Sequence, residues 1–452
     1  MEPSPVRRLP GSTLFLLATA AAVNAQSRPL SDSVMALNRA GKWELAGPIA
    51  VRGMQSATSP DERCTLALAA LYAAAKTMRY NEGTRELKPF EERCGGTAVA
   101  KTYPEEIAFI HRELTLPPMP TAGVDWSAVD QFWMAVDTLS RDIEPSPEQW
   151  RALLTSPGYR IATISHPNIG RAIEIAFKPS RRPARDSILS RRSEDSATVA
   201  HLLVAAAARD ELRRFRAVLE PVVVDTIAYA TRNASRFLPA GAVDHAPPLV
   251  TFSMFASDGY AQAPGIVLDL YHVRENGLGD FLSHEFHHSF ASRLDRTTTG
   301  QTAPDARFYQ AIRQLKNEGI ADMIDKAQHP LVTTPGMKWY GDAYNVAYDK
   351  TPATLKVIDS LLVAAGGDSA KLVDAGARAQ RLLIYGSHPN GAYMAHTILE
   401  VFGRDSVIAA IPSAFVFVRM YEAAEAKRGH ASPFSTEGHT ALSAMESRHV
   451  KP

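Results

Sequence analysis

Apolar residues recur every three or four positions over most of the chain, a period that predicts amphipathic helices. Residues 31 to about 115 show this pattern in several short stretches, including the alanine-rich run at 64–78. The proline cluster at 116–120 interrupts the pattern and predicts a domain boundary. We therefore expect a small helical N-terminal domain over residues 26–120, which would serve as a prodomain or a docking cap.

The second part of the chain, residues 121–452, combines helices with a small sheet. Helical spacing predicts helices at 129–139, 147–154 and 199–230, and again from about residue 280 onward. In Leu249–Phe255 the period changes to two, and a second apolar run follows at Ile266–Tyr271, so both are expected to be strands. The basic stretch 179–192 is interpreted as a solvated face or loop. This order of elements predicts an α+β fold that is predominantly helical.

Length and charge narrow the classes of function. The chain has 452 residues, more than one hydrophobic core usually organises, which agrees with two folded units. Hydrophobic residues make up 45% and charged residues 21%, as is typical of soluble globular proteins. The formal net charge is +1, which is too small to favour nucleic acid or an anionic membrane as the main partner. A neutral partner such as a peptide is compatible with this charge.

The first 25 residues are typical of a signal peptide. Arg7 and Arg8 precede a short apolar run at 12–23, and small residues follow at Val23 and Ala25. Because the run is too short to span a bilayer, a cleaved signal peptide is favoured over an uncleaved anchor. We expect a secreted or periplasmic mature chain without a membrane anchor, since no later stretch approaches the about twenty apolar residues that a membrane helix needs.

The two cysteines, Cys64 and Cys94, agree with export. An even cysteine count in an exported chain predicts one disulfide, and two buried free thiols are the alternative. Closing a loop of this length would stabilise the folded state by about 3–4 kcal/mol in the chain-entropy model.

The segment 280–290 contains the motif HExxH at His284, Glu285 and His288. Residues four apart lie on one face of a helix, so the two imidazoles can bind one tetrahedral ion. Glu285 lies about a hundred degrees round the helix, where it can take a proton from the attacking water without binding the metal. The helix is supported by an apolar stripe at spacing four: Leu282, Phe286, Phe290 and Leu294.

A second helix is predicted over Asp305–Gln328 and contains Glu318. A catalytic zinc site needs a third protein ligand and one open position. Glu318 can supply that ligand if this helix packs antiparallel to the motif helix. Asp322, one turn later, can accept the second ring N–H of a ligating histidine. Gly319 is expected to let the two helices approach closely.

The motif HEFHH followed by NEGIAD resembles the gluzincin class of metallopeptidases, the thermolysin-like group. More narrowly, it is similar to a family of exported bacterial proteins described as "putative zinc-dependent peptidases". The resemblance implies a zincin-like metallopeptidase domain over residues 121–452, with Zn²⁺ as cofactor and Glu285 as general base. It also implies a small sheet whose edge strand aligns the substrate, for which Leu249–Phe255 is our candidate.

Gluzincin-like sites use a tyrosine or histidine from a later segment to stabilise the oxyanion. The resemblance makes His388 and Tyr393 candidates for this role. Asn390 suits the N-cap of the helix that follows, and Gly403 suits its C-terminal end. The nearby aromatic residues are interpreted as core or cleft wall: Trp339, Tyr340, Tyr344 and Tyr348.

Alternative assignments stay open for part of this site. The metzincin pattern is rejected because Ala291 and Leu294 stand where it requires glycine and histidine. His287 points about a hundred degrees away from His288, so it is interpreted as structural or as a support for the ligands. The other candidates for the third ligand are His329, Asp322 and Asp325.

The sequence as a whole thus predicts an exported zinc metallopeptidase that acts on a peptide or protein substrate. One rival is an exported binding protein on a non-catalytic zincin-like scaffold. The other is a zinc hydrolase that acts on a non-peptide bond. The sequence indicates neither the cleavage specificity nor the oligomeric state.

Overall fold

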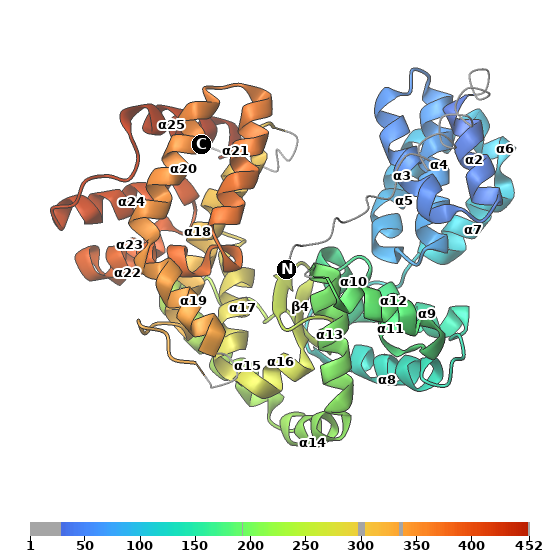
Figure 1. Cartoon of the computed structure of the whole chain (residues 1–452), viewed down its shortest axis with the longest axis horizontal. Helices are drawn as coiled ribbons and strands as arrows, with labels where there is room; N and C mark the ends of the chain where they lie inside the picture. Colours follow the sequence, from blue (N-terminus) through green and yellow to red (C-terminus); the bar gives the residue numbers. More distant parts are fainter. Residues whose placement is uncertain (1–28, 192, 297–302, 334–337, 451–452) are drawn as a thin grey trace, which may run out of the picture. The chain divides into compact units, whose positions relative to one another are not determined.

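The computed structural model describes residues 29–450, apart from 192, 297–302 and 334–337 (Figure 1). The predicted signal peptide, residues 1–25, lies outside the described residues. Two compact units are present. Unit 1 contains residues 29–119 and 131–184, and unit 2 contains residues 120–130 and 185–450. The predicted boundary at residue 120 stays a prediction, because compactness alone does not show which part folds by itself.

Unit 1 is entirely helical in the residues described. Its elements are α2 (Leu30–Arg39), α3 (Trp43–Ser56), α4 (Pro60–Lys76), α5 (Tyr80–Cys94), α6 (Ala98–Thr102), α7 (Pro104–Leu114), α9 (Pro147–Leu154), α10 (Pro157–Ser165), α11 (Ile169–Phe177) and the 3₁₀ turn η1 (Pro179–Arg181). Helices α8 (Ser127–Leu139) and α12 (Arg182–Leu189) cross the division between the units. The predicted disulfide is confirmed: Cys64 of α4 is bonded to Cys94 of α5, with Cα atoms 5.6 Å apart.

Unit 2 contains a four-stranded sheet in the order β1-β2-β4-β3. The strands are β1 (Val124–Asp125), β2 (Leu249–Ser253), β3 (Gly259–Gln262) and β4 (Gly265–Asp269). β1, β2 and β4 run parallel, and β3 pairs antiparallel with β4. All residues of β2 and β4 are buried, as expected for parallel strands covered on both faces. Our edge-strand prediction was wrong, because β2 is flanked by β1 and β4, and β3 forms an edge instead.

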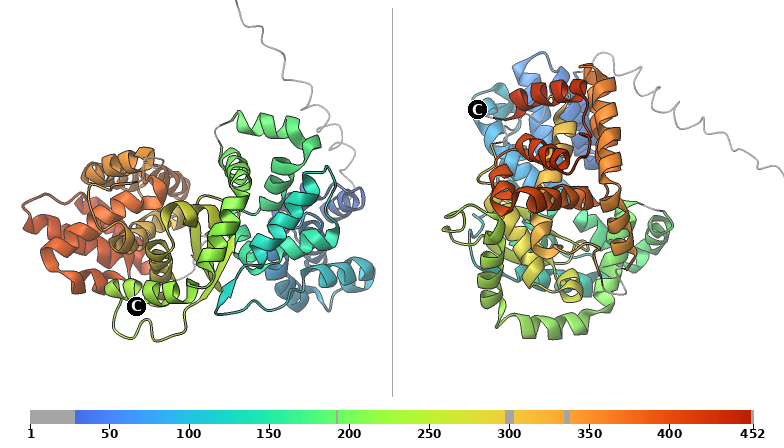
Figure 2. Two further views of the ribbon diagram at one scale, coloured as in Figure 1. Left: turned by 90° about the horizontal axis from the view of Figure 1, so that it is seen from below. Right: turned by 90° about the vertical axis from the view of Figure 1, so that its left-hand side faces the viewer.

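Helices make up the rest of unit 2, so the predicted helix-rich α+β fold is confirmed (Figures 1 and 2). They are α13 (Glu194–Ala207), α14 (Arg209–Leu219), α15 (Val223–Ala234), α16 (Leu270–Asn276), α17 (Gly279–Ala291), α18 (Ala306–Asp325), α19 (Lys338–Asp349), α20 (Thr351–Ala365), α21 (Ser369–Leu382), α22 (His388–Phe402), α23 (Arg404–Ala410), α24 (Ala414–Lys427) and α25 (Thr436–His449), with 3₁₀ turns η2 (Ser235–Phe237) and η4 (Tyr385–Ser387). The long helix α18 contacts α17, α21, α22 and α24. No described helix is both long and apolar enough to cross a bilayer.

The crossing of α18 and α22 depends on two glycines. A Cβ atom on Gly319 would lie 2.7 Å from the Cα atom of Gly391, and a Cβ atom on Gly391 would lie 2.8 Å from the Cα atom of Gly319. Neither position therefore has room for a side chain. Gly319 was expected to bring α18 close to the motif helix α17. The expected partner helix was wrong, because Gly319 lies against Gly391 of α22.

The start of α22 also differs from the prediction. Ser387, with φ of 82°, precedes the helix as its N-cap residue, and His388 is the first helical residue. Asn390, predicted as the N-cap, instead lies inside the first turn and is buried. Its amide group donates hydrogen bonds to the carbonyl oxygen of Ala347 and to the hydroxyl of Thr351. The predicted end is confirmed, because Gly403 follows the last residue of α22 with φ of 82°.

Candidate metal centre

The HExxH residues lie on α17, which is held by a buried apolar face. Its fully buried apolar side chains are Leu282, Phe286 and Phe290. The helix ends at Ala291, so Leu294 does not extend the stripe as the spacing predicted. Packing of α17 against α15, α18 and β3 fixes its position. His284 and His288 therefore extend from one face of a well-anchored helix.

Three side-chain atoms from α17 and α18 converge. The Nε2 atoms of His284 and His288 lie 2.9 Å apart. The Oε2 atom of Glu318 lies 3.0 Å from Nε2 of His288 and 3.5 Å from Nε2 of His284. Glu318 extends from α18, which packs against α17. Two imidazoles one helical turn apart and one carboxylate from a second helix thus form a compact group of three donors.

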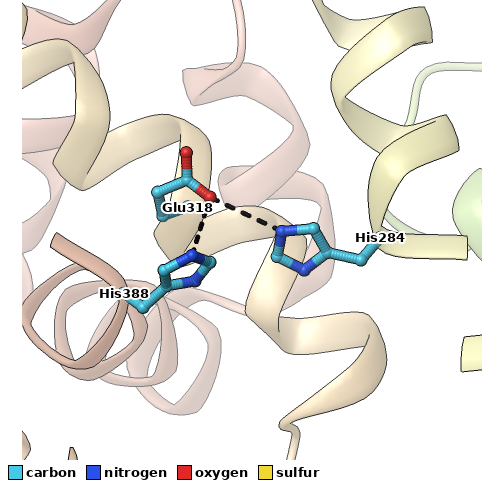
Figure 3. A group of neighbouring side chains, drawn as sticks. All are labelled: His284, Glu318 and His388. Atoms are coloured by element: carbon cyan, nitrogen blue, oxygen red, sulfur yellow. Dashed lines mark ion pairs between the residues drawn. The ribbon is translucent and has the colours of Figure 1, made fainter. Parts of the chain in front are cut away.

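A third helix brings His388 to the same place (Figure 3). Its Nε2 atom lies 3.4 Å from Oε2 of Glu318, and its ring centroid lies 5.4 Å from that of His284. One donor atom each from His284, Glu318 and His388 lie within 4.8 Å of one another. In Figure 3 the three side chains come from separate helices and point towards a common centre. His388 was predicted as a candidate for stabilising the oxyanion. It lies next to the converging donors.

The Nδ1 atoms of two histidines face carboxylates on the last turns of α18. The Oδ1 atom of Asp325 lies 3.0 Å from Nδ1 of His284, whereas Oδ1 of Asp322 lies 3.6 Å from it. Asp322 is instead 2.8 Å from Nδ1 of His388. Because each carboxylate accepts the Nδ1–H of its ring, the Nε2 atoms are directed towards Glu318. Asp322 was predicted to orient a ligating histidine, but Asp325 is the closer partner of His284.

Lys326 joins these two carboxylates. Its Nζ atom lies 2.8 Å from Oδ1 of Asp322 and 2.7 Å from Oδ2 of Asp325. The hydroxyl of Tyr344 donates to the other oxygen of Asp322 at 2.9 Å. Burial alone would lower the pKa of Lys326, but the two carboxylates outweigh it and hold that pKa well above its usual value. The lysine therefore stays cationic between two ionised carboxylates.

Glu318 and Glu285 have different environments. Burial raises the pKa of Glu318, but the rings of His288 and His388 outweigh this effect and hold its pKa well below the usual value. For Glu285, burial dominates and raises the pKa to about 8, although His284 opposes the shift. The N–H of Ala261 on β3 donates to the Glu285 carboxylate. Glu318 is therefore fixed as an anion, whereas Glu285 has a higher proton affinity, as a proton-transfer group requires.

Comparison with known proteins agrees with this geometry. Residues 150–429 match the family described as "putative zinc dependent peptidase" (DUF5700), which is more than half of the 452 residues. The chain belongs to this family. No curated protein and no solved structure matches the chain. The matched segment includes α17, α18 and the start of α22, and therefore all of the converging donors.

Membership of the DUF5700 family makes zinc the cofactor, and the donors fit it. Zinc bonds of about 2.0–2.1 Å in tetrahedral geometry place the donor atoms about 3.3–3.4 Å apart. The separations among His284, His288 and Glu318 are 2.9, 3.0 and 3.5 Å. Two imidazole nitrogens and one carboxylate oxygen also form a donor set that zinc prefers. The residues present can therefore hold the ion without rearrangement of the backbone.

Two other predicted residues, Tyr393 and His329, contact side chains outside the group of converging donors. The Tyr393 ring packs among aromatic side chains, with centroid distances of 5.2 Å to Tyr348 and 6.1 Å to Tyr421. His329 is stacked on Tyr348 and lies 3.0 Å from the carboxylate of Asp349. Among the described residues, no hydrogen bond, ion pair or ring contact joins Tyr393 or His329 to the converging donors.

His287 and the aromatic residues of α19 have supporting positions. The Nε2 atom of His287 is 3.3 Å from the carbonyl oxygen of Phe237, and burial lowers the pKa of the ring to about 3. The ring is therefore neutral, and it turns away from the ligands as predicted from its position on the helix. Tyr344 and Tyr348 are buried, whereas Trp339 is 61% exposed and is not part of the core.

Proposed function

We propose that the chain is a gluzincin-type zinc peptidase in which His284, His288 and Glu318 bind the metal. The proposal rests on the convergence of their three donor atoms within 3.5 Å of one another. Three protein ligands leave one tetrahedral position for water or substrate, which is typical of catalytic zinc sites. A structural zinc site would instead use all four positions for protein ligands.

Glu285 is proposed as the general base. It follows the first ligand on α17, it is 5% exposed, and the next helical turn carries the second ligand. Its carboxylate takes a proton from the attacking water and passes it to the amine that leaves. Burial raises the pKa of Glu285, so the ionised carboxylate next to the metal is a stronger proton acceptor than an exposed one.

Zinc, when bound, supplies a Lewis acid that polarises the peptide carbonyl and makes water nucleophilic at neutral pH. His388 is proposed to donate a hydrogen bond from Nε2 to the carbonyl oxygen as its negative charge develops. Asp322 beside Nδ1 stabilises the imidazolium form, in which both ring nitrogens carry hydrogen. One donor of this kind contributes about 3–4 kcal/mol to transition-state stabilisation.

The edge strand β3 is proposed to align the substrate. It borders the base directly, because the N–H of Ala261 on this strand reaches the Glu285 carboxylate. An extended peptide can add to an exposed sheet edge through backbone hydrogen bonds, largely independently of its side chains. The substrate would then lie with one peptide bond near Glu285 and His388.

The test compares the native protein with Glu285→Gln for zinc content and for cleavage of a mixed peptide library. We expect both proteins to retain zinc, and we expect the variant to lose about 10²–10⁴-fold in turnover, the usual contribution of acid–base catalysis. Glu437→Gln, at an exposed glutamate in the first turn of α25, is the matched control and should behave like the native protein.

Two results would oppose the proposal. Native-like cleavage by Glu285→Gln would remove the general-base role. Zinc binding without any peptide cleavage by the native protein would favour a binding protein or a hydrolase of non-peptide bonds.

We also propose export with removal of residues 1–25. Expression of the full chain in a bacterial host tests this, because N-terminal sequencing of the mature protein should begin at Gln26. An uncleaved N-terminus in the cell extract would contradict it.

A further inference from the structure

We propose that Lys326 is a positioning residue of the zinc centre, whose ammonium group serves as a built-in cation for the carboxylates that orient His284 and His388. This inference rests on the proposed zinc ligation. Lys326 immediately follows α18 as its C-cap residue, and its side chain is 17% exposed. The ammonium group is thus held at the end of the helix that carries Glu318.

The contacts of Lys326 connect two imidazole–carboxylate pairs. Its Nζ atom lies 2.7 Å from Oδ2 of Asp325, whose Oδ1 atom lies 3.0 Å from Nδ1 of His284. Nζ also lies 2.8 Å from Oδ1 of Asp322, and the same oxygen lies 2.8 Å from Nδ1 of His388. One ammonium group therefore fixes the partners of both rings at the same time.

The same place offers the donor set of a cation site. Donor atoms of His284, Asp322 and Asp325 lie within 4.8 Å of one another. Two carboxylates this close repel each other unless a positive charge lies between them. Lys326 supplies that charge from within the chain, so the second cluster needs no second metal ion. The centre is accordingly mononuclear.

The balance of charge supports this role. Four carboxylates (Glu285, Glu318, Asp322 and Asp325) carry four negative charges when Glu285 is ionised as the base. The two charges of a zinc ion and the imidazolium of His388 leave one of them uncompensated. The ammonium of Lys326 compensates it. Without that ammonium group, Asp322 and Asp325 would move apart, and the rings of His284 and His388 would lose their fixed orientation. Loss of the hydrogen-bond partners that orient metal ligands lowers metal affinity or activity by about 10–100-fold.

The first experiment measures zinc affinity by competition with a chelator, together with zinc per chain. The native protein should bind one zinc ion tightly. Lys326→Met should raise the zinc dissociation constant by about 10–100-fold, and Lys326→Arg should restore much of the affinity. Lys356→Met, the same change at an exposed lysine of α20, is the control and should leave the affinity unchanged.

A second measurement reports geometry rather than stability. The visible absorption of the cobalt(II)-substituted protein depends on how the ligands surround the ion. Lys326→Met should change this spectrum, while Lys356→Met should not. A purely structural role for Lys326 would lower the urea midpoint of unfolding but leave the spectrum and the zinc affinity of the folded variant as they are.

Three outcomes would overturn the inference. The first is a Lys326→Met variant with a zinc dissociation constant within about twofold of the native value, well below the expected loss. The second is two tightly bound zinc ions in the native protein. The third is native zinc affinity in Lys326→Gln, whose amide can donate to both carboxylates but carries no charge. This variant replaces Lys326→Met if the latter does not fold.

These measurements remain informative if the protein cleaves no peptide. If the proposed peptidase function is wrong, the native protein will cleave no peptide. If the proposed role of Lys326 is wrong, Lys326→Met will bind zinc as tightly as the native protein. The two failures are therefore distinguishable.

Discussion

Substitution of Gly391 by alanine tests whether the α18–α22 crossing positions the catalytic groups. The new Cβ atom would lie 2.8 Å from the Cα atom of Gly319. Carbon atoms pack favourably at about 3.5–4.0 Å, so this contact alone requires the helices to separate by about 0.7–1.2 Å. The carbonyl oxygen of Leu315 lies closer still to the new Cβ atom, which makes this range a minimum. The clash involves backbone on both sides, and no side-chain rotation can relieve it.

The stability effect has two opposing parts. Replacing glycine by alanine inside a helix stabilises it by about 1 kcal/mol, whereas overpacking costs about 1–3 kcal/mol. Because the obstacle is backbone, we expect the upper part of that range. The net result should be a lower free energy of unfolding by about 1–2 kcal/mol.

The effect on activity should exceed the effect on stability. His388 begins α22 three residues before Gly391, and its Nε2 atom is 3.4 Å from Oε2 of Glu318. A separation of about 1 Å between the helices would move this ring away from the metal site. Misplacement by about 1 Å can cost about 10²-fold in rate, so we expect kcat to fall by that order while most of the protein stays folded.

The assay combines urea unfolding with peptide cleavage at saturating zinc. Gly96→Ala is the control, because a Cβ atom there meets nothing within 4 Å, and it should be neutral. If Gly391→Ala kept both the native urea midpoint and the native kcat, the close approach of α18 and α22 would not be needed. The contact between Gly319 and Gly391 would then have no part in placing His388.

Three further predictions concern single groups. Asp325→Asn should weaken zinc binding by about 10–100-fold, since it removes the Nδ1 partner of His284, a proposed ligand, and native affinity in a chelator competition would contradict this. Asp322→Asn should mainly lower kcat with a smaller change in zinc affinity, because its nearer ring partner is not a proposed ligand; steady-state kinetics at saturating zinc would measure the split. Replacing Cys64 and Cys94 by serine should lower the free energy of unfolding of the helical N-terminal region by about 3–4 kcal/mol without affecting zinc binding. Urea unfolding and zinc analysis measure the two effects. An unchanged free energy of unfolding would contradict this prediction.

Much of the fold was predictable because helices carry their signal locally. The predicted helix at 147–154 has the same bounds as α9, and the predicted stop of α22 at Gly403 was correct. The strand β3 was not predicted, because Gly259–Gln262 is a short segment without regular alternation. Its place at the sheet edge depends on its pairing with β4, which its own residues do not reveal.

The sequence alone determined which groups are available for the chemistry. Spacing of four placed His284 and His288 on one face, and a second helical pattern marked Glu318 as a third ligand within reach. Neither prediction needed long-range information, because the geometry of one helix fixes the relative directions of its side chains.

Only the tertiary structure decided how those groups are supported. Asp322 and Asp325 both lie near Glu318 on α18, and the rotation of α18 against α17 and α22 assigns one to His388 and the other to His284. The place of Lys326 between them likewise follows from the packing. Such contacts depend on the distance and rotation between helices, which packing of the whole core sets and which no local pattern records.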